Sequence, residues 1–268
     1  MEVRFFNGGH CRQLQAFVDR RTWRIAPFFA VFLAVRHPAR GWVLIDTGYS
    51  DGFAAATRRW PACLYRWTTP VTATASTADI LRRAGIDPAA IRDIVLTHFH
   101  ADHIGGVKDF PAARFHHGAE ALEPLLKLSA FAQTRHAFLP ALLPGDFAAR
   151  AAAVPLAGFR PHPQLGMPAH DLFGDGSLTL VSLPGHAPGH LGVFFETPAG
   201  PLLYAADAYW HHRQIEDSTA PLPPARIFIH DNRAYDATVA QLRRLARAGL
   251  ALAACHCPHT QRHVAAPG

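Results

Sequence analysis

The residues that could carry chemistry are concentrated in one stretch, 97–106. Three histidines and one aspartate lie within six residues of it: His98, His100, Asp102 and His103. Neutral imidazole and carboxylate are the ligand types found in zinc, manganese and iron sites. A purely structural role is disfavoured, because polar rings packed so closely in a core would each need a hydrogen-bond partner. The stretch therefore predicts a metal site.

The elements around this stretch indicate how its side chains are positioned. The stretch 91–96 (IRDIVL), which ends in three apolar residues and contains three β-branched ones, directly precedes it and predicts a buried strand. The candidate ligands would then follow the end of a strand, where loops on a rigid scaffold commonly carry functional sites. We expect Gly105 and Gly106 to let the backbone turn sharply and approach a metal without side-chain clash.

The pattern His-x-His-x-Asp-His resembles the signature of the metallo-β-lactamase superfamily, and four further segments resemble motifs of that family in the same order. These segments are 44–48 (LIDTG), 184–190 (PGHAPGH), 203–207 (LYAAD) and 253–256 (AACH). The resemblance implies an α/β fold with αβ/βα layering, a four-layer sandwich of two mixed β-sheets flanked by helices. Within the superfamily, the chain is most similar to the N-acyl-homoserine lactonase branch.

The resemblance also implies two divalent metal ions in neighbouring sites. The implied ligands are His98, His100 and His186 for the first ion, Asp102, His103 and His256 for the second, and Asp207 as a bridge. Asp102 and Asp207 are the implied catalytic residues. Zinc is the first expectation for both ions, with Mn²⁺ or Fe²⁺ as alternatives. Two such ions about 3.5–4 Å apart lower the pKa of a shared water towards ~7, so a bridging hydroxide would attack the substrate carbonyl.

Two residues, Asp46 and His190, are implied to support the ligands from behind. Asp46 has a second interpretation, as a turn residue whose carboxylate accepts local backbone N–H groups. His190 also competes with His186 for the ligand role, and the family motif favours His186.

The end of the chain leaves a similar choice between His256 and His259. We favour His256, because it directly follows the predicted closing strand over 250–255. If that strand continued through Cys257, alternation would point Cys255 and Cys257 away from the metals. We therefore expect no cysteine ligand.

The resemblance predicts a lactonase or esterase. In the lactonase branch a tyrosine commonly stands three residues after the bridging aspartate and contacts the substrate. Here that position is Trp210, preceded by Tyr209. We expect both rings either to bind substrate or to fill the core beside the site. The alternatives are a glyoxalase-II-like thioesterase, a nuclease or phosphodiesterase of the same superfamily, and a non-catalytic metal-binding module. No serine nucleophile elbow or phosphate-cradling loop is present.

Length and composition bound the remaining expectations. The 268 residues are 49% hydrophobic and 17% charged, which indicates a globular chain. The net charge of +6 comes from scattered arginines, so we expect a small-molecule substrate and no nucleic acid. The first residues lack the pattern of a signal peptide, and no apolar run is long enough to cross a bilayer. We therefore expect a cytoplasmic protein with no membrane span, and the sequence leaves its oligomeric state open.

We expect one domain over 1–268, with a helical cap-like insert at about 110–175. The apolar spacing there is helical but interrupted by prolines. The aromatic stretch 49–75 is irregular, and either borders the pocket or packs on the domain edge. Further along the chain, 227–230 predicts a short strand and 236–248 an amphipathic helix.

Overall fold

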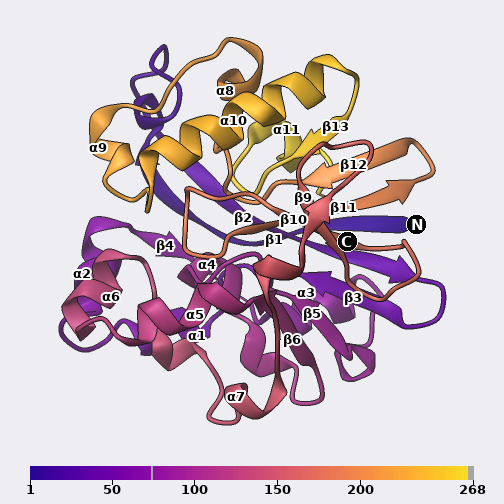
Figure 1. The fold of residues 1–268 in the computed structure, drawn as a ribbon. Coiled ribbons are helices and arrows are strands. Elements are labelled where there is room, and N and C mark those ends of the chain that lie inside the picture. The colour runs from indigo at the N-terminus through magenta and orange to yellow at the C-terminus, as the bar shows by residue number, and fades with distance from the viewer. Residues whose placement is uncertain (74, 265–268) are drawn as a thin grey trace.

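The computed structural model describes residues 1–73 and 75–264, which form two mixed β-sheets packed between helices (Figure 1). The first sheet has the order β4 (Val71–Thr72), β1 (Glu2–Leu14), β2 (Ile25–His37), β3 (Gly41–Ile45), β5 (Asp93–Val95), β6 (Arg114–Gly118) and β7 (Ala151–Val154). The second has the order β13 (Ala251–Ala253), β12 (Gly200–Tyr204), β11 (Leu191–Thr197), β10 (Thr179–Ser182), β9 (Pro168–Asp171) and β8 (Arg160–Pro161).

Both sheets combine parallel and antiparallel pairs. In the first sheet β1, β2 and β3 are antiparallel neighbours, whereas β3, β5, β6 and β7 run parallel. In the second, β12 and β13 are parallel and the other pairs are antiparallel. Strands β10, β12 and β13 therefore run in one direction. As a result, the loops that follow these strands leave the second sheet at one edge.

Strand β2 shows how the sequence builds the layers. Val31, Leu33 and Val35 pack between the two sheets, and the alternating Phe32 and Ala34 pack against helices on the other face. All five side chains are at most 1% exposed. A strand covered on both faces requires a continuous apolar run, which is what this stretch supplies.

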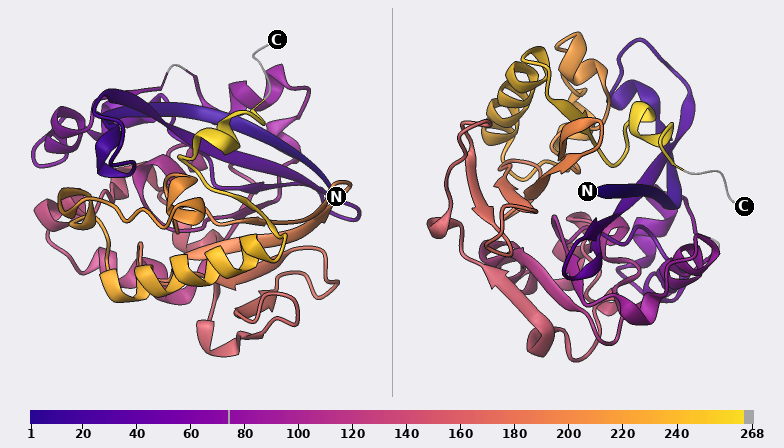
Figure 2. Two further views of the ribbon diagram at one scale, coloured as in Figure 1. Left: turned by 90° about the horizontal axis from the view of Figure 1, so that it is seen from above. Right: turned by 90° about the vertical axis from the view of Figure 1, so that its right-hand side faces the viewer.

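Helices cover the outer faces of both sheets, as Figures 1 and 2 show. The α-helices are α1 (Gly52–Ala56), α2 (Cys63–Thr68), α3 (Thr77–Arg83), α4 (Ala101–Ile104), α5 (Ala119–Leu126), α6 (Ala130–Arg135), α7 (Phe147–Arg150), α8 (Arg213–Glu216), α9 (Pro223–Arg226), α10 (Asn232–Arg247) and α11 (Pro258–Gln261). Short 3₁₀ turns are η1 (Gln15–Phe17), η2 (Pro88–Ala90), η3 (Val107–Asp109), η4 (Pro140–Leu142) and η5 (Leu156–Gly158). No helix among the described residues has the length and apolarity needed to cross a membrane.

Helix α10 covers the second sheet. Its apolar face contributes Tyr235, Val239 and Leu242 to the core on that side, in agreement with the predicted amphipathic helix. Asp231 caps its first turn by accepting hydrogen bonds from the backbone N–H groups of Arg233 and Ala234. The predicted sandwich of two mixed sheets flanked by helices is thus confirmed.

The predicted strand over 227–230 is wrong. These residues form a turn after α9, and Ile227 and Phe228 are 70% and 49% exposed. The adjacent Pro223 starts a helix, because its fixed φ suits the first helical position. A run of three apolar residues cannot distinguish a strand from an exposed turn by periodicity alone.

The segment 110–175 is helical only in part. It contains α5, α6 and α7, but also β6 and β7 of the first sheet and β8 and β9 of the second. Phe138, Leu142 and Phe147 from its helical turns are at most 4% exposed and pack against the first sheet. These turns thus bury their apolar residues in the core that the sheet shares with its helices.

Candidate metal centre

Four strands deliver the predicted ligands to one place, and a fifth delivers the supporting residue Asp46. His98 and His100 follow β5, and Asp102 and His103 lie in the short helix α4 after them. The other three follow strands of the second sheet: His186 after β10, Asp207 after β12 and His256 after β13. The fifth strand, β3, ends just before Asp46. The ends of parallel strands meet at one edge of a sheet, so side chains distant in sequence converge there.

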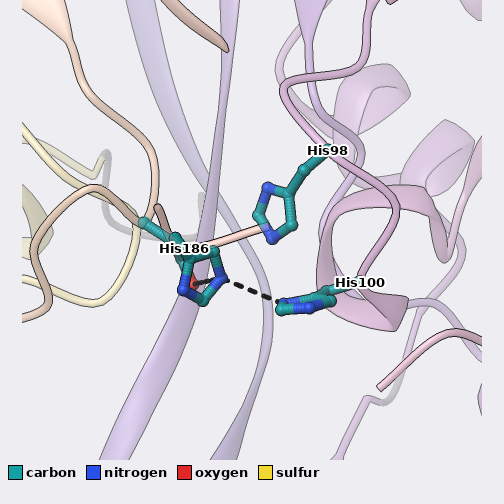
Figure 3. A group of neighbouring side chains, drawn as sticks. His98, His100 and His186 are labelled. Atoms are coloured by element: carbon teal, nitrogen blue, oxygen red, sulfur yellow. Dashed lines mark hydrogen bonds and ion pairs between the residues drawn. The ribbon is translucent and has the colours of Figure 1, made fainter. Parts of the chain in front are cut away.

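The first group of side chains that could hold an ion is His98, His100, His186 and Asp207, whose candidate ligand atoms all lie within 4.8 Å of one another. Figure 3 shows the three imidazoles converging, with His186 arriving from a different segment than the other two. His186 Nε2 lies 3.0 Å from His100 Nδ1 and 3.4 Å from Asp207 Oδ2.

The second group contains Asp102, His103, Cys255 and His256, again within 4.8 Å of one another. His256 Nε2 lies 3.2 Å from Asp102 Oδ2, and His103 Nε2 lies 3.7 Å from the same oxygen. Both rings are held from behind through Nδ1: His103 by Asp46 Oδ2 at 2.7 Å and His256 by the Phe29 carbonyl at 2.8 Å.

Asp207 reaches both groups. Its Oδ2 lies 3.1 Å from His256 Nε2 and 3.4 Å from His186 Nε2, while its Oδ1 lies 3.4 Å from His103 Nε2. The indole N–H of Trp210 donates to Oδ2 at 3.2 Å. One carboxylate is therefore placed between two sets of nitrogen donors.

Asp46 combines the two roles that its motif suggested. Besides the bond to His103, its carboxylate accepts hydrogen bonds from the backbone N–H and the hydroxyl of Thr97, at 2.8 and 2.9 Å. Its backbone has φ 61°, a left-handed conformation that is uncommon for a residue with a side chain. Such local strain is commonly retained at functional sites, and here it turns the carboxylate towards the ring of His103.

His190 lies behind the centre rather than within either group. Its Nδ1 donates to the Leu183 carbonyl at 3.0 Å, and its Nε2 accepts from the backbone N–H of Asp207 at 3.4 Å. Both ring nitrogens are thus engaged by backbone groups. His259 lies in α11, 3.7 Å from Glu216, and belongs to neither group.

Burial keeps the three histidines of the first group neutral. It lowers the pKa of His98 and His186 well below the ordinary value, and neighbouring imidazoles lower both further. Burial also lowers the pKa of His100 to about 4. At neutral pH these rings are therefore in the form whose lone pair can bind a cation.

The second group favours positive charge. Burial alone would lower the pKa of His103 and His256, but Asp46 acts on the first ring and Asp207 on the second, and both pKa values are raised. For Asp207 burial acts in the opposite direction, yet the adjacent His256 and His103 hold its pKa well below the usual range. A cation fits this environment.

The candidate ligand atoms indicate whether a metal ion would fit at this centre. Four buried side-chain atoms at the centre have no hydrogen-bond partner among the described residues: His98 Nε2, His103 Nε2, His186 Nδ1 and Asp207 Oδ1. Buried polar atoms without partners are costly, because desolvation is not compensated. Metal ions would engage such atoms, so the residues present fit a metal centre.

Two expectations about neighbouring residues need correction. Strand β13 ends at Ala253, so alternation does not continue to Cys255, and its Sγ lies among the second group rather than pointing away. Gly105 and Gly106 pack against backbone and Thr77 rather than against the centre. A Cβ on Gly105 would lie 2.6 Å from the Gly48 carbonyl oxygen, and one on Gly106 would collide with Thr77.

A cavity of about 360 Å³ opens beside the two groups. His100, Asp102, His186, Asp207 and His256 line its floor, together with Trp210. Tyr209 is not among the lining residues; it is 3% exposed and packs in the core of the second sheet. Of the lining residues in the part of the chain described, only Ala137 comes from 110–175.

Several cavity residues were not found from the sequence. Phe17, Phe28, Ile227 and Phe228 form much of an apolar wall, and Tyr49 and Tyr65 lie on the side of β1 and α2. The aromatic content of 49–75 was a signal, but its irregular spacing gave no direction for the rings. A larger hollow of about 540 Å³, lined by residues such as Arg160 and Glu196, lies along β8 and β9 and contains none of the candidate ligands.

Comparison with known proteins identifies relatives of the chain. The sequence profile of the family described as "Metallo-beta-lactamase superfamily" matches residues 27–251. N-acyl homoserine lactonase AttM of Azorhizobium caulinodans is 29% identical over 198 residues, a match that covers 69% of this chain and 68% of that protein.

Solved structures have the same fold. An N-acyl homoserine lactone hydrolase with N-hexanoyl-L-homoserine bound at its catalytic metal centre matches with a TM-score of 0.72 and 17% identity, over 98% of this chain and 96% of that one. AidC, a dizinc quorum-quenching lactonase, matches with a TM-score of 0.69 and 18% identity, over 96% of this chain and 87% of that one. At these identities the structural matches support the fold alone.

Proposed function

The chain belongs to the metallo-β-lactamase superfamily, and we propose that it is a dinuclear metal-dependent lactonase acting on a lactone or related ester with an apolar acyl chain. One observation carries this proposal. Unpartnered, buried donor atoms from several strand ends converge around Asp207, directly beneath a cavity with an apolar wall. The lactonase activity of relatives such as AttM supports the same assignment.

The proposed ligands are those implied by the sequence. His98, His100 and His186 hold one ion, Asp102, His103 and His256 hold the other, and Asp207 binds both. Two ions held there would supply a hydroxide at neutral pH and would polarise the ester carbonyl. Zinc is the ion that we propose first, because it accepts this mixture of imidazole and carboxylate.

The remaining residues orient these side chains. Asp46 and the Phe29 carbonyl fix which nitrogen of His103 and His256 faces the centre. Trp210 donates to Asp207 and thereby restricts rotation of the carboxylate. Its ring also lines the cavity, where we propose that it contacts the substrate. Tyr209 we assign to the core.

The cavity wall favours an uncharged, partly apolar substrate. No lysine or arginine occurs among the described residues that line it. A glutathione thioester carries carboxylates away from its reacting carbonyl, and such a wall would leave their negative charge unpaired. An acyl chain, by contrast, gains by burial against Phe17, Phe28 and Ile227.

Metal analysis combined with a substrate panel tests the proposal. Untagged protein, reconstituted with zinc, is expected to contain close to two ions per chain by elemental analysis. It should hydrolyse an N-acyl-homoserine lactone faster than a thioester, a phosphodiester or a nitrocefin-type lactam. Brisk thioester cleavage without lactone turnover would contradict the lactonase assignment, and well under one ion per chain would contradict the dinuclear centre.

A further inference from the structure

Two tyrosines lie together in the cavity wall formed by β1 and α2. The hydroxyl oxygens of Tyr49 and Tyr65 are 3.3 Å apart, and both rings line the cavity that contains Asp102 and His256. Phe53 packs edge-on against each of them, with ring centroids 5.3 and 5.4 Å away. Both rings are therefore held in place before any ligand binds.

The two tyrosine hydroxyls together have one O–H donor that their mutual hydrogen bond does not use. One hydrogen bond between two hydroxyls uses one O–H donor, so the other remains available. Burial raises the pKa of both phenols well above the ordinary value, so both remain protonated at neutral pH. Tyr49 is 1% exposed and Tyr65 is 9% exposed. Tyr65 is thus the phenol that faces the open cavity, and Tyr49 can donate to it from behind.

Three other side-chain donors in the wall, those of Gln13, Thr68 and Trp210, are already engaged. Gln13 donates its side-chain amide to Thr68 and Thr69, at 3.1 and 3.2 Å. The Thr68 hydroxyl donates to the Leu64 carbonyl at 2.9 Å, and Trp210 donates to Asp207. A substrate oxygen that needs a neutral donor would find it at the phenol pair.

The cavity also suggests which substrate oxygen would lie there. Phe17, Phe28, Ile227 and Phe228 belong to η1, β2 and the turn after α9, whereas Tyr65 belongs to α2. In Figure 1, α9 lies at the upper left of the molecule and α2 at its lower left. If the acyl chain occupies the apolar wall, the alcohol side of the ester extends towards the tyrosines.

We propose, resting on the lactonase function proposed above, that Tyr65 donates a hydrogen bond to the leaving oxygen of the ester, with Tyr49 orienting it. The acyl C–O bond of the ring breaks as a new C–O bond forms to the oxygen of water. The leaving oxygen becomes a hydroxyl by taking a proton that originates from that water. Tyr65 keeps its own proton and stabilises the negative charge that develops on the leaving oxygen.

Leaving-group dependence tests this role. The variant Tyr65→Phe is compared with wild type on a lactone and on a 4-nitrophenyl ester with the same acyl chain. An alkoxide needs a donor, whereas nitrophenolate leaves readily without one. We expect kcat on the lactone to fall about 100-fold, and kcat on the aryl ester to fall less than about tenfold. Tyr49→Phe should shift both rates in the same directions but by less.

A binding measurement separates this role from a structural one. By isothermal titration calorimetry, wild-type protein should bind the hydroxy acid produced from the lactone more tightly than the matching acid without the hydroxyl. Tyr65→Phe should remove that preference, a change of about fivefold for one neutral hydrogen bond. Metal content and melting temperature should remain those of the wild type.

Equal losses on both esters, an unchanged lactone rate or an unchanged preference for the hydroxy acid would overturn the assignment of Tyr65. If wild-type protein hydrolyses neither ester, the proposed function fails instead. The two failures are therefore distinguishable.

Discussion

The two halves of the candidate metal centre are organised differently. In the second group, His103 and His256 are each held from behind by an acceptor, the Asp46 carboxylate and the Phe29 carbonyl. In the first group, the Thr97 hydroxyl lies 3.1 Å from His98 Nδ1, but His100 and His186 contact one another at 3.0 Å. We infer that the second group is oriented before an ion binds, whereas the first depends on the ion to complete it.

The carboxylate between the two groups gives the largest expected effect. Asp207→Ala removes a carboxylate that reaches both sets of donors. We expect it to abolish measurable hydrolysis and to reduce bound metal from two ions per chain to one or fewer. Kinetics and elemental analysis of the same preparation measure both quantities. Full occupancy by two ions in this variant would remove the bridging role from Asp207.

Asp46→Ala tests whether the second group is oriented before an ion binds. It removes the hydrogen bond that fixes the ring of His103, so activity should fall about 10- to 100-fold, the usual effect of losing such support. Competition with a chromophoric chelator should show that the variant binds one of its two ions more weakly than the wild-type protein does.

His190→Ala provides a matched comparison behind the first group, because the His190 ring is bonded to backbone groups only. A more severe defect in His190→Ala than in His186→Ala would exchange the roles of those two histidines.

Stepwise metal removal compares the two groups in the unmodified chain. Among the described residues no hydrogen-bond acceptor holds the ring of His100 or His186 from behind, so we expect the ion of the first group to leave first. The first group should bind its ion about tenfold or more weakly than the second group binds its own, because loss of supporting hydrogen bonds typically lowers metal affinity by that factor. Cobalt substitution followed by chelator titration would show two steps in the absorption spectrum. A single step that removes both ions together would contradict the predicted difference in affinity between the two ions.

The smallest expected effect concerns the cavity wall beside the first group. Trp210→Ala should raise KM for long-chain lactones more than for short ones, by a few-fold, because it removes apolar contact surface. Metal content should change little. A uniform change across chain lengths would assign Trp210 to holding Asp207 alone rather than to the acyl chain.

The sequence was informative where chemistry is concentrated in short motifs. The metal-ligand pattern of 98–103, the strand before it and the segments around His186, Asp207 and His256 led to a set of residues that the fold brings together. The layered fold followed from the same motifs. Strand β2 adds an independent reason, since its continuous apolar run requires cover on both faces.

The errors arose where the outcome depends on packing. Cys255 was placed by assuming a closing strand that continues through Cys257, whereas β13 ends at Ala253, so the alternation of side chains does not extend to Cys255. The composition of the turn at 227–230 predicts a strand, although Ile227 and Phe228 are exposed. The direction of Tyr65 depends on how the short helix α2 packs against Phe53, which periodicity does not encode.

Anomalous diffraction from crystals of the zinc-reconstituted protein tests the central claim most directly. Data collected at the zinc absorption edge should show two peaks per chain, about 3.5–4 Å apart. One peak should lie among His98, His100 and His186, the other among Asp102, His103 and His256, with Asp207 between them. A single peak, or a second one outside these residues, would contradict the dinuclear centre.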